Sequence, residues 1–135
     1  MPFINTTLDV RTGNGLNDIL LETLEYVTKA GIHYRAPIGG TTDGLSVPRC
    51  VQNIIPATGG DWFSGVLHDS AYRNQLEVLV DSVWIKARLT KDVCDLLLLE
   101  ALLSQDVSEL EAYAIYNAVK VCGDKAFNED RLANP

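Results

Sequence analysis

Basic side chains are in the minority in this chain of 135 residues. Eleven Lys and Arg stand against 18 Asp and Glu, so the formal net charge is −7. Binding to a nucleic-acid backbone requires clustered Lys and Arg, because these side chains neutralise the phosphates, and here they are scattered. We therefore expect no nucleic-acid partner.

Cysteine is also scarce. The three cysteines, Cys50, Cys94 and Cys122, form no Cys-x-x-Cys pair. Their odd number and the apolar helix positions of two of them predict reduced core residues in an intracellular protein rather than zinc ligands. A chain of this length buries roughly two thirds of its unfolded surface. We expect one domain over residues 1–135 that requires no cofactor to fold.

Long hydrophobic runs are absent. The longest, Leu96 to Leu103, is interrupted by Glu100, and a membrane-spanning helix needs about 20 apolar residues. The start of the chain lacks a basic segment followed by an apolar one, the pattern of an export signal. We therefore expect no transmembrane segment and a protein that stays inside the cell that makes it.

The chain divides into residues 8–49, mainly strands and loop, and residues 61–123, mainly helices. The runs 20–27 and 32–37 flank the turn-forming residues Lys29, Ala30 and Gly31, which predicts an antiparallel hairpin. His33 lies in the second of these strands, where a surface or cross-strand position is expected. The predicted fold class is α+β, with N-terminal antiparallel strands packed on a three-helix C-terminal part.

Capping residues predict three helices. Asp61 is the expected N-cap of a helix that runs to about Gln75, Thr90 caps a second, and Ser108 with Glu111 forms a capping box for a third that Gly123 ends. The segment from Leu76 to Arg88 is compatible with a strand pair or a helix.

Apolar positions at helical spacing indicate which faces the second and third helices bury. In the second helix these are Val93, Cys94, Leu97, Leu98, Ala101 and Leu102. In the third they are Leu110, Tyr113, Ala114, Tyr116, Ala118 and Val121.

The most informative pattern is His68-Asp69 followed by Tyr72, in a chain with only two histidines. One helical turn separates His68 from Tyr72, so the two side chains share a face. Asp95 lies among apolar neighbours on the second helix, where an unpaired carboxylate would cost several kcal/mol. We predict that Asp95 accepts a hydrogen bond from His68, which leaves the second ring nitrogen free to take a proton from water. The alternative is a structural histidine beside a solvated carboxylate.

A Gly-rich loop, residues 39–49, contains three further candidates: Asp43, Ser46 and Arg49. A guanidinium directly after Pro48 suits binding of a substrate or anion, or a fixed ion pair with a carboxylate. Asp43 and Ser46 can equally bond local amides in a turn. If the loop belongs to the site, Arg49 should pair with Asp69 or Asp43 near His68.

Several segments together resemble the phage and prophage family catalogued as domain of unknown function 1353. They are the strand ending at Pro37, the loop 42–49, the segment 67–73, the pair Cys94-Asp95 and the helix 113–123. Cys94 stands where the family pattern has Ala, Leu98 where it has an aromatic residue, and residues 38–41 replace a shorter step. The resemblance implies a gene product of a tailed phage or prophage and no particular activity.

Four residues also resemble the site of secreted calcium-dependent phospholipases. In that comparison His68 is the general base, Asp69 a calcium ligand, and Tyr72 and Asp95 hold the histidine. The disulfide framework and the Gly-rich calcium loop of those enzymes are missing. Because calcium prefers several oxygen ligands, Asp69 would need carbonyl groups from residues 39–44 to bind Ca²⁺ or another divalent metal.

Three functions are compatible with these patterns. The first is a small hydrolase that acts on a small-molecule or lipid substrate, with His68, Asp95 and Tyr72 as catalytic residues. The second is a non-catalytic virion protein or a binder of a host factor in counter-defence, in which the same residues form a structural polar network. The third is a ligand pocket without turnover that uses Arg49 and His68. The expected location is the cytoplasm of the infected bacterial host, or the virion.

Overall fold

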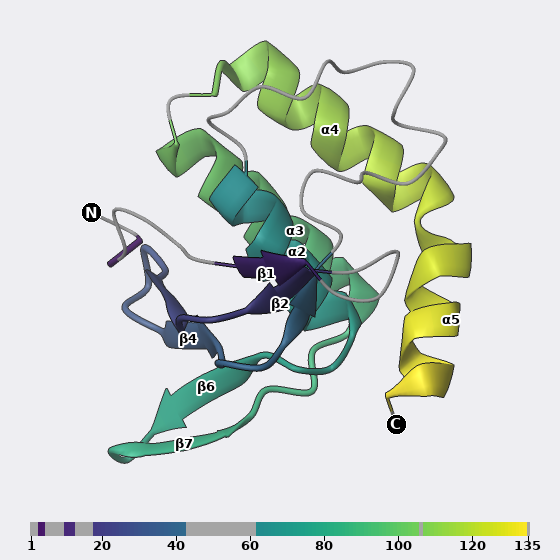
Figure 1. The fold of residues 1–135 in the computed structure, drawn as a ribbon. Coiled ribbons are helices and arrows are strands. Elements are labelled where there is room, and N and C mark those ends of the chain that lie inside the picture. Colours follow the sequence, from purple (N-terminus) through teal and green to yellow (C-terminus); the bar gives the residue numbers. More distant parts are fainter. Residues whose placement is uncertain (1–2, 5–9, 13–17, 43–61, 106, 135) are drawn as a thin grey trace.

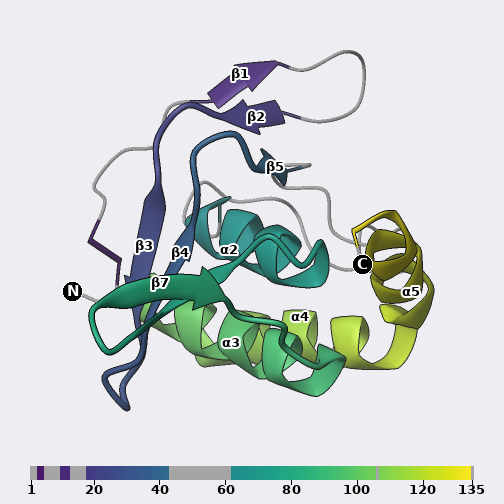
Figure 2. The same ribbon diagram turned by 90° about the horizontal axis from the view of Figure 1, so that it is seen from below.

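A computed structural model describes residues 3–4, 10–12, 18–42, 62–105 and 107–134. Two antiparallel sheets lie beside a group of helices (Figures 1 and 2). The smaller sheet has the order β1-β2-β5 and the larger has the order β3-β4-β6-β7. The α+β class predicted from the sequence is therefore confirmed.

The strands are β1 (Val10–Thr12), β2 (Asp18–Leu20), β3 (Leu24–Val27), β4 (His33–Ala36), β5 (Thr41–Thr42), β6 (Glu77–Val80) and β7 (Val83–Lys86). The described helices are α2 (Trp62–Tyr72), α3 (Lys91–Ser104), α4 (Glu109–Cys122) and α5 (Asp124–Ala133).

The predicted hairpin is formed by β3 and β4, which pair from Leu24 with Ala36 to Val27 with His33. Its first strand begins at Leu24 and not at Leu20, which ends β2 of the smaller sheet. Gly31 has a φ of +86°, a conformation that favours glycine, and its N–H donates to the carbonyl of Thr28 at 2.9 Å. His33 is exposed, as expected for a strand-end position. Glu100 of α3 fixes the hairpin on the helices, because its carboxylate accepts from the hydroxyl of Tyr26 at 2.9 Å and from the N–H of Lys29 at 3.0 Å.

The segment that the sequence left open between strands and helix is the hairpin β6–β7. Asp81 and Ser82, with φ of 50° and 66°, form its two-residue turn, as expected for a turn that follows the twist of the strands. The region 61–123 therefore holds a strand pair between its helices.

Helix α2 ends at Tyr72, three residues before the predicted end at Gln75. Asn74 adopts a left-handed conformation with φ of 59°, its N–H donates to the carbonyl of Ala71, and the N–H of Gln75 donates to that of Ser70. This pair of bonds is the Schellman motif, which closes a helix. Asp61, the predicted N-cap, lies outside the described residues.

Two predicted caps are confirmed. The hydroxyl of Thr90 accepts from the N–H of Val93 at the start of α3, and that of Ser108 accepts from the N–H of Glu111 at the start of α4. Helix α4 ends before Gly123 as predicted, but α5 begins directly after it. The sequence analysis did not predict α5.

The buried face of α4 was predicted only in part, because Tyr116 and Ala118 pack against the core as expected but other predicted residues do not. Leu110 and Val121 are 84% and 80% exposed, and Tyr113 is also exposed, whereas Ala112, Ile115 and Val119 are buried. On α3 the predicted face is correct except for Val93, which is exposed.

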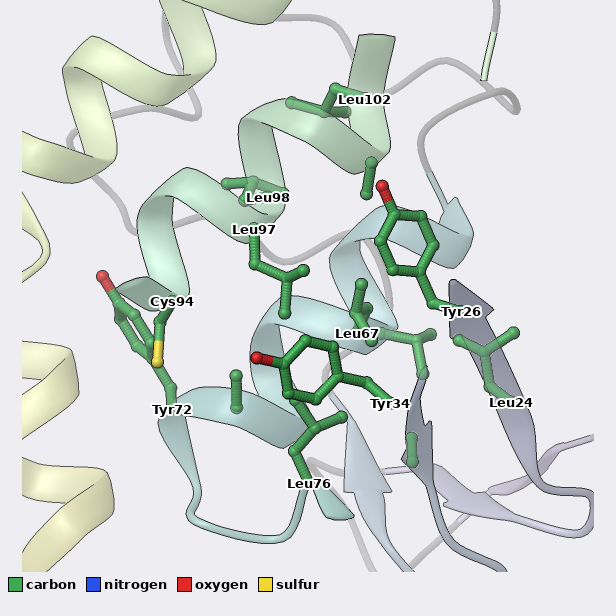
Figure 3. Close-up of a cluster of buried hydrophobic side chains, with 14 of the residues drawn as sticks. Leu24, Tyr26, Tyr34, Leu67, Tyr72, Leu76, Cys94, Leu97, Leu98 and Leu102 are labelled. Atoms are coloured by element: carbon green, nitrogen blue, oxygen red, sulfur yellow. The ribbon is translucent and has the colours of Figure 1, made fainter. Parts of the chain in front are cut away.

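The buried apolar residues form one cluster between the larger sheet and the helices. Figure 3 shows Tyr26 and Tyr34 reaching from the sheet toward leucines of α2 and α3, among them Leu67 and Leu97. Because both tyrosines lie on the same face of their strands, they fill the space over which α2 and α3 pack.

The cysteine prediction is correct for Cys94 and wrong for Cys122. Cys94 is free and buried, and desolvation raises the pKa of its thiol to about 12. Cys122 is disulfide-bonded, so it is not a reduced residue. Cys50 lies outside the described residues.

Candidate functional site

Helices α2 and α3 bring His68, Tyr72 and Asp95 together in the interior. All three are buried, with 6%, 3% and 1% of their surfaces exposed. His68 and Tyr72 lie one turn apart on α2, and their rings pack with centroids 4.1 Å apart. Asp95 lies near the start of α3, on the side that the packing of apolar neighbours turns inward.

The predicted hydrogen bond between His68 and Asp95 is confirmed. Nε2 of His68 lies 3.0 Å from Oδ1 of Asp95, and the hydroxyl of Tyr72 donates to the same oxygen at 2.6 Å. Nδ1 of His68 has no hydrogen-bond partner among the described residues. It is also not among the completely buried side-chain atoms of these residues without a partner, which are Oγ of Ser64, Oγ of Ser70 and Oδ1 of Asn74. Among the described residues, the site therefore holds one ring nitrogen and gives the other no hydrogen-bond partner.

Lys91 completes the surroundings of Asp95 and was missed by the sequence analysis. Its Nζ donates to Oδ2 of Asp95 at 2.7 Å and to the carbonyl groups of Val119 and Lys120 at 3.1 and 3.3 Å. Oδ1 of Asp124 lies 3.6 Å from Nζ of Lys91. A Lys and an Asp at positions i and i+4 of a helix are a recognisable sign of such a pair.

These contacts determine the charge of Asp95. Burial alone would raise the pKa of its carboxyl, but hydrogen bonds from His68, Lys91 and Tyr72 hold that pKa below the ordinary 3.8. Asp95 is therefore a carboxylate at neutral pH, and Nε2 of His68 must carry the proton between them. Burial and the hydrogen bond to Asp95 raise the pKa of Tyr72, which stays a neutral donor.

The corner between α4 and α5 closes the other side of the site. A Cβ atom at Gly123 would lie 2.8 Å from the hydroxyl of Tyr72 and 2.5 Å from the carbonyl oxygen of Val119. No larger residue fits there without displacing Tyr72 or the end of α4. This steric requirement is the reason for a glycine at a position whose φ of −83° does not itself demand one.

Arg131 of α5 caps the end of α2. Its Nε donates to the carbonyl of Tyr72 at 2.9 Å, and its Nη2 donates to those of Ala71 at 3.0 Å and Leu89 at 2.5 Å. Phe127, from the same helix, packs edge-on against Tyr72. Because the last carbonyls of a helix have no partner within it, a cation suits this place.

The remaining predicted site residues are not brought into this cluster by any described contact. Asp43, Ser46 and Arg49 lie outside the described residues, so the pairing of Arg49 with Asp69 or Asp43 stays a prediction. Asp69 is partly buried and is engaged in an interaction. Within the described ranges, no group of three or more His, Cys, Asp or Glu side chains is arranged to hold a metal ion.

Replacing Lys91 with methionine should lower the free energy of unfolding by about 1–3 kcal/mol, because Asp95 loses a charge-assisted donor while it stays buried. Urea denaturation measures the change. The matched control is Lys125→Met, because Lys125 is 88% exposed and its pair with Glu129 is 4.0 Å long. Equal stability of the two variants would show that Lys91 does not support Asp95.

The arrangement is chemically a carboxylate that orients an imidazole, with a tyrosine and a lysine holding the carboxylate. Such a set can hold a neutral imidazole ready to accept a proton, or it can serve only to fix two helices. None of the described helices is both long and apolar enough to pass through a bilayer.

A family model described as "Protein of unknown function (DUF1353)" matches residues 19–119, a range that includes all of β3, β4, β6, β7, α2 and α3 as well as His68, Tyr72 and Asp95. Neither the curated proteins nor the solved structures yielded a match.

Proposed function

We propose that this chain, which belongs to the family of proteins of unknown function DUF1353 and carries the buried His68–Asp95 dyad within the matched region, is a small hydrolase with His68 as general base. The observation that carries the proposal is that only one of the two ring nitrogens of His68 is hydrogen-bonded to a described residue. Nε2 is bound to Asp95 at 3.0 Å, and Nδ1 has no partner among the described residues.

In the proposed reaction, Nδ1 accepts a proton from a water molecule as the water oxygen attacks the carbonyl carbon of an ester or amide. The imidazolium that forms lies beside the Asp95 carboxylate, which stabilises it. The same proton then passes to the leaving alcohol or amine, so the imidazole is regenerated. Tyr72 and Lys91 position Asp95 and do not exchange protons in this scheme.

Asp69 is proposed to hold the substrate or a divalent cation such as Ca²⁺. The support for a metal is the phospholipase resemblance at four residues, and a carboxylate oxygen is a suitable ligand. The other ligands would have to be backbone carbonyls of residues 39–44.

The competing function is a non-catalytic protein in which the dyad is a structural network. The observation that favours it is burial, because the His68 side chain keeps only 8% of its surface exposed. A completely satisfied polar network fixes the packing of two helices in one register. Such a protein would act through its surface, as a virion component or as a binder of a host factor.

Chemical modification distinguishes the two functions. Diethyl pyrocarbonate acylates accessible imidazoles, and exposed His33 is the other histidine of the chain and serves as the internal control. For the hydrolase we expect His68 to react in the native protein, more slowly than His33, with peptide mass spectrometry as the readout. The opposite result would be that His33 reacts completely in the native protein while His68 reacts only after unfolding in urea. That result would contradict a role of His68 as catalytic base.

The phage or prophage origin and a location in the host cytoplasm or the virion are part of the proposal. Their support is the resemblance described above. Mass spectrometry of purified particles and of infected-cell lysates would separate a virion component from a protein of the host cytoplasm.

A further inference from the structure

Strand β7 forms an open edge of the larger sheet. The strand order ends at β7, and Figure 1 shows no described element beyond it. An edge strand presents unpaired N–H and C=O groups that a further strand can bind.

The register shows which backbone groups of β7 are open. The N–H of Ala87 donates to the carbonyl of Leu76 at 2.9 Å, and Ile85 and Val83 lie opposite Val78 and Val80. Because the hydrogen-bonding direction alternates along an antiparallel strand, the odd-numbered residues face β6. The N–H and C=O groups of Trp84 and Lys86 therefore point away from the sheet.

The side chains of β7 leave this edge accessible. Arg35 of β4 lies over the ring of Trp84 at 4.4 Å from its centroid. The indole therefore lies on the same face of the sheet as Arg35 and not over the backbone edge of β7. On the opposite face Val83 and Ile85 are 58% and 47% exposed, so the apolar face that is buried under the helices extends unprotected to β7.

Charge specifies the orientation of the partner strand. The hairpin tip carries Asp81, and the other end of β7 carries Lys86 and Arg88; none of these three takes part in an ion pair with another described residue. An antiparallel second copy brings the acidic tip of each β7 next to the basic end of the other. A parallel copy would place like charges side by side.

We propose that β7 pairs antiparallel with β7 of a second copy of this chain, about a two-fold axis perpendicular to the sheet. The two four-stranded sheets become one continuous sheet through bonds from the backbone of Trp84 and Lys86. Val83 and Ile85 of both copies meet on one face. A two-fold interface of this kind is closed, because the β7 edges of both copies pair with each other and neither can bind a third copy.

Light scattering coupled to size exclusion, over a range of protein concentrations, tests the assembly. The expected result is a mass that rises from 14.8 kDa toward twice that value and falls again in high salt, because the tip charges are screened. Amide hydrogen exchange at Trp84 and Lys86 should slow as concentration rises. A mass of one chain throughout, or fast exchange at both amides in the dimer, would overturn the proposal.

Two variants locate the interface. Ile85→Lys should raise the dissociation constant at least roughly tenfold, because like charges then face each other across the two-fold axis. Leu110→Lys makes the same change on α4, at a residue that is 84% exposed, and should leave it unchanged. Asparagine at position 81 tolerates the positive φ of the turn. Asp81→Asn should therefore keep the hairpin and raise the dissociation constant up to about fivefold, because it removes the charge at the tip. If Leu110→Lys dissociates the dimer and Ile85→Lys does not, the interface lies elsewhere.

Discussion

Asp95→Ala is expected to destabilise the protein by roughly 3–5 kcal/mol, because it leaves the partly buried ammonium of Lys91 without its nearest carboxylate. Tyr72 and His68 lose their shared acceptor in the same step. A loss of this size is a large fraction of the stability of a typical domain. Urea denaturation of the wild type and the variant measures it. A change below about 1 kcal/mol would mean that water replaces the carboxylate and that the network contributes little.

The pH dependence of Asp95→Asn provides an independent measurement. The pKa of Asp95 is lowered in the folded state, so its contribution is present above the ordinary value of 3.8 and is lost as pH falls through the lower folded value. We expect the wild type to be more stable than Asp95→Asn at neutral pH. The difference should shrink as the pH falls below about 4. A difference that is independent of pH would show that the carboxylate charge plays no part.

His68→Ala is expected to lower hydrolysis of nitrophenyl ester probes by about a hundredfold to ten-thousandfold, the usual range for loss of a general base. The accompanying loss of stability should be smaller than for Asp95→Ala, about 1–2 kcal/mol, because Asp95 keeps Tyr72 and Lys91 as donors. His33→Ala, at an exposed strand position, is the control. Its activity and stability should match those of the wild type.

Thermal melts of the same variants with and without calcium separate the two functions further. If Asp69 helps to bind calcium in the hydrolase, the ion should raise the melting temperature of both wild type and His68→Ala. A variant that melts several degrees lower, hydrolyses the probes as fast as the wild type and does not respond to calcium would contradict the catalytic proposal.

The dyad was predictable from the sequence because it follows from local rules. A carboxylate among apolar neighbours requires a partner, and His68 with Tyr72 at helical spacing supplied one. Lys91 was harder to identify. It lies in the first turn of α3, where a long side chain can extend into solvent, and the carbonyls of Val119 and Lys120 that hold it lie far along the chain.

The elements of α+β character were also encoded locally, in the capping residues Thr90 and Ser108 and in the turn at Gly31. The buried face of α4 was not, because Leu110 and Val121 are as apolar as the residues that are buried in their place. Which apolar stripe is covered depends on the position of neighbouring helices. Helix α5 has no buried residue, so the periodicity that identifies amphipathic helices gave little indication of it.

Arg131 has a consequence for synthesis of the chain on the ribosome. The β3–β4 hairpin can form early, because its strands are close in sequence, but the carbonyl of Tyr72 at the end of α2 waits for a guanidinium about sixty positions downstream. Until Arg131 emerges, the carbonyl of Tyr72 in the nascent chain lacks this donor. The dyad therefore acquires its final surroundings only after α5 has been synthesised.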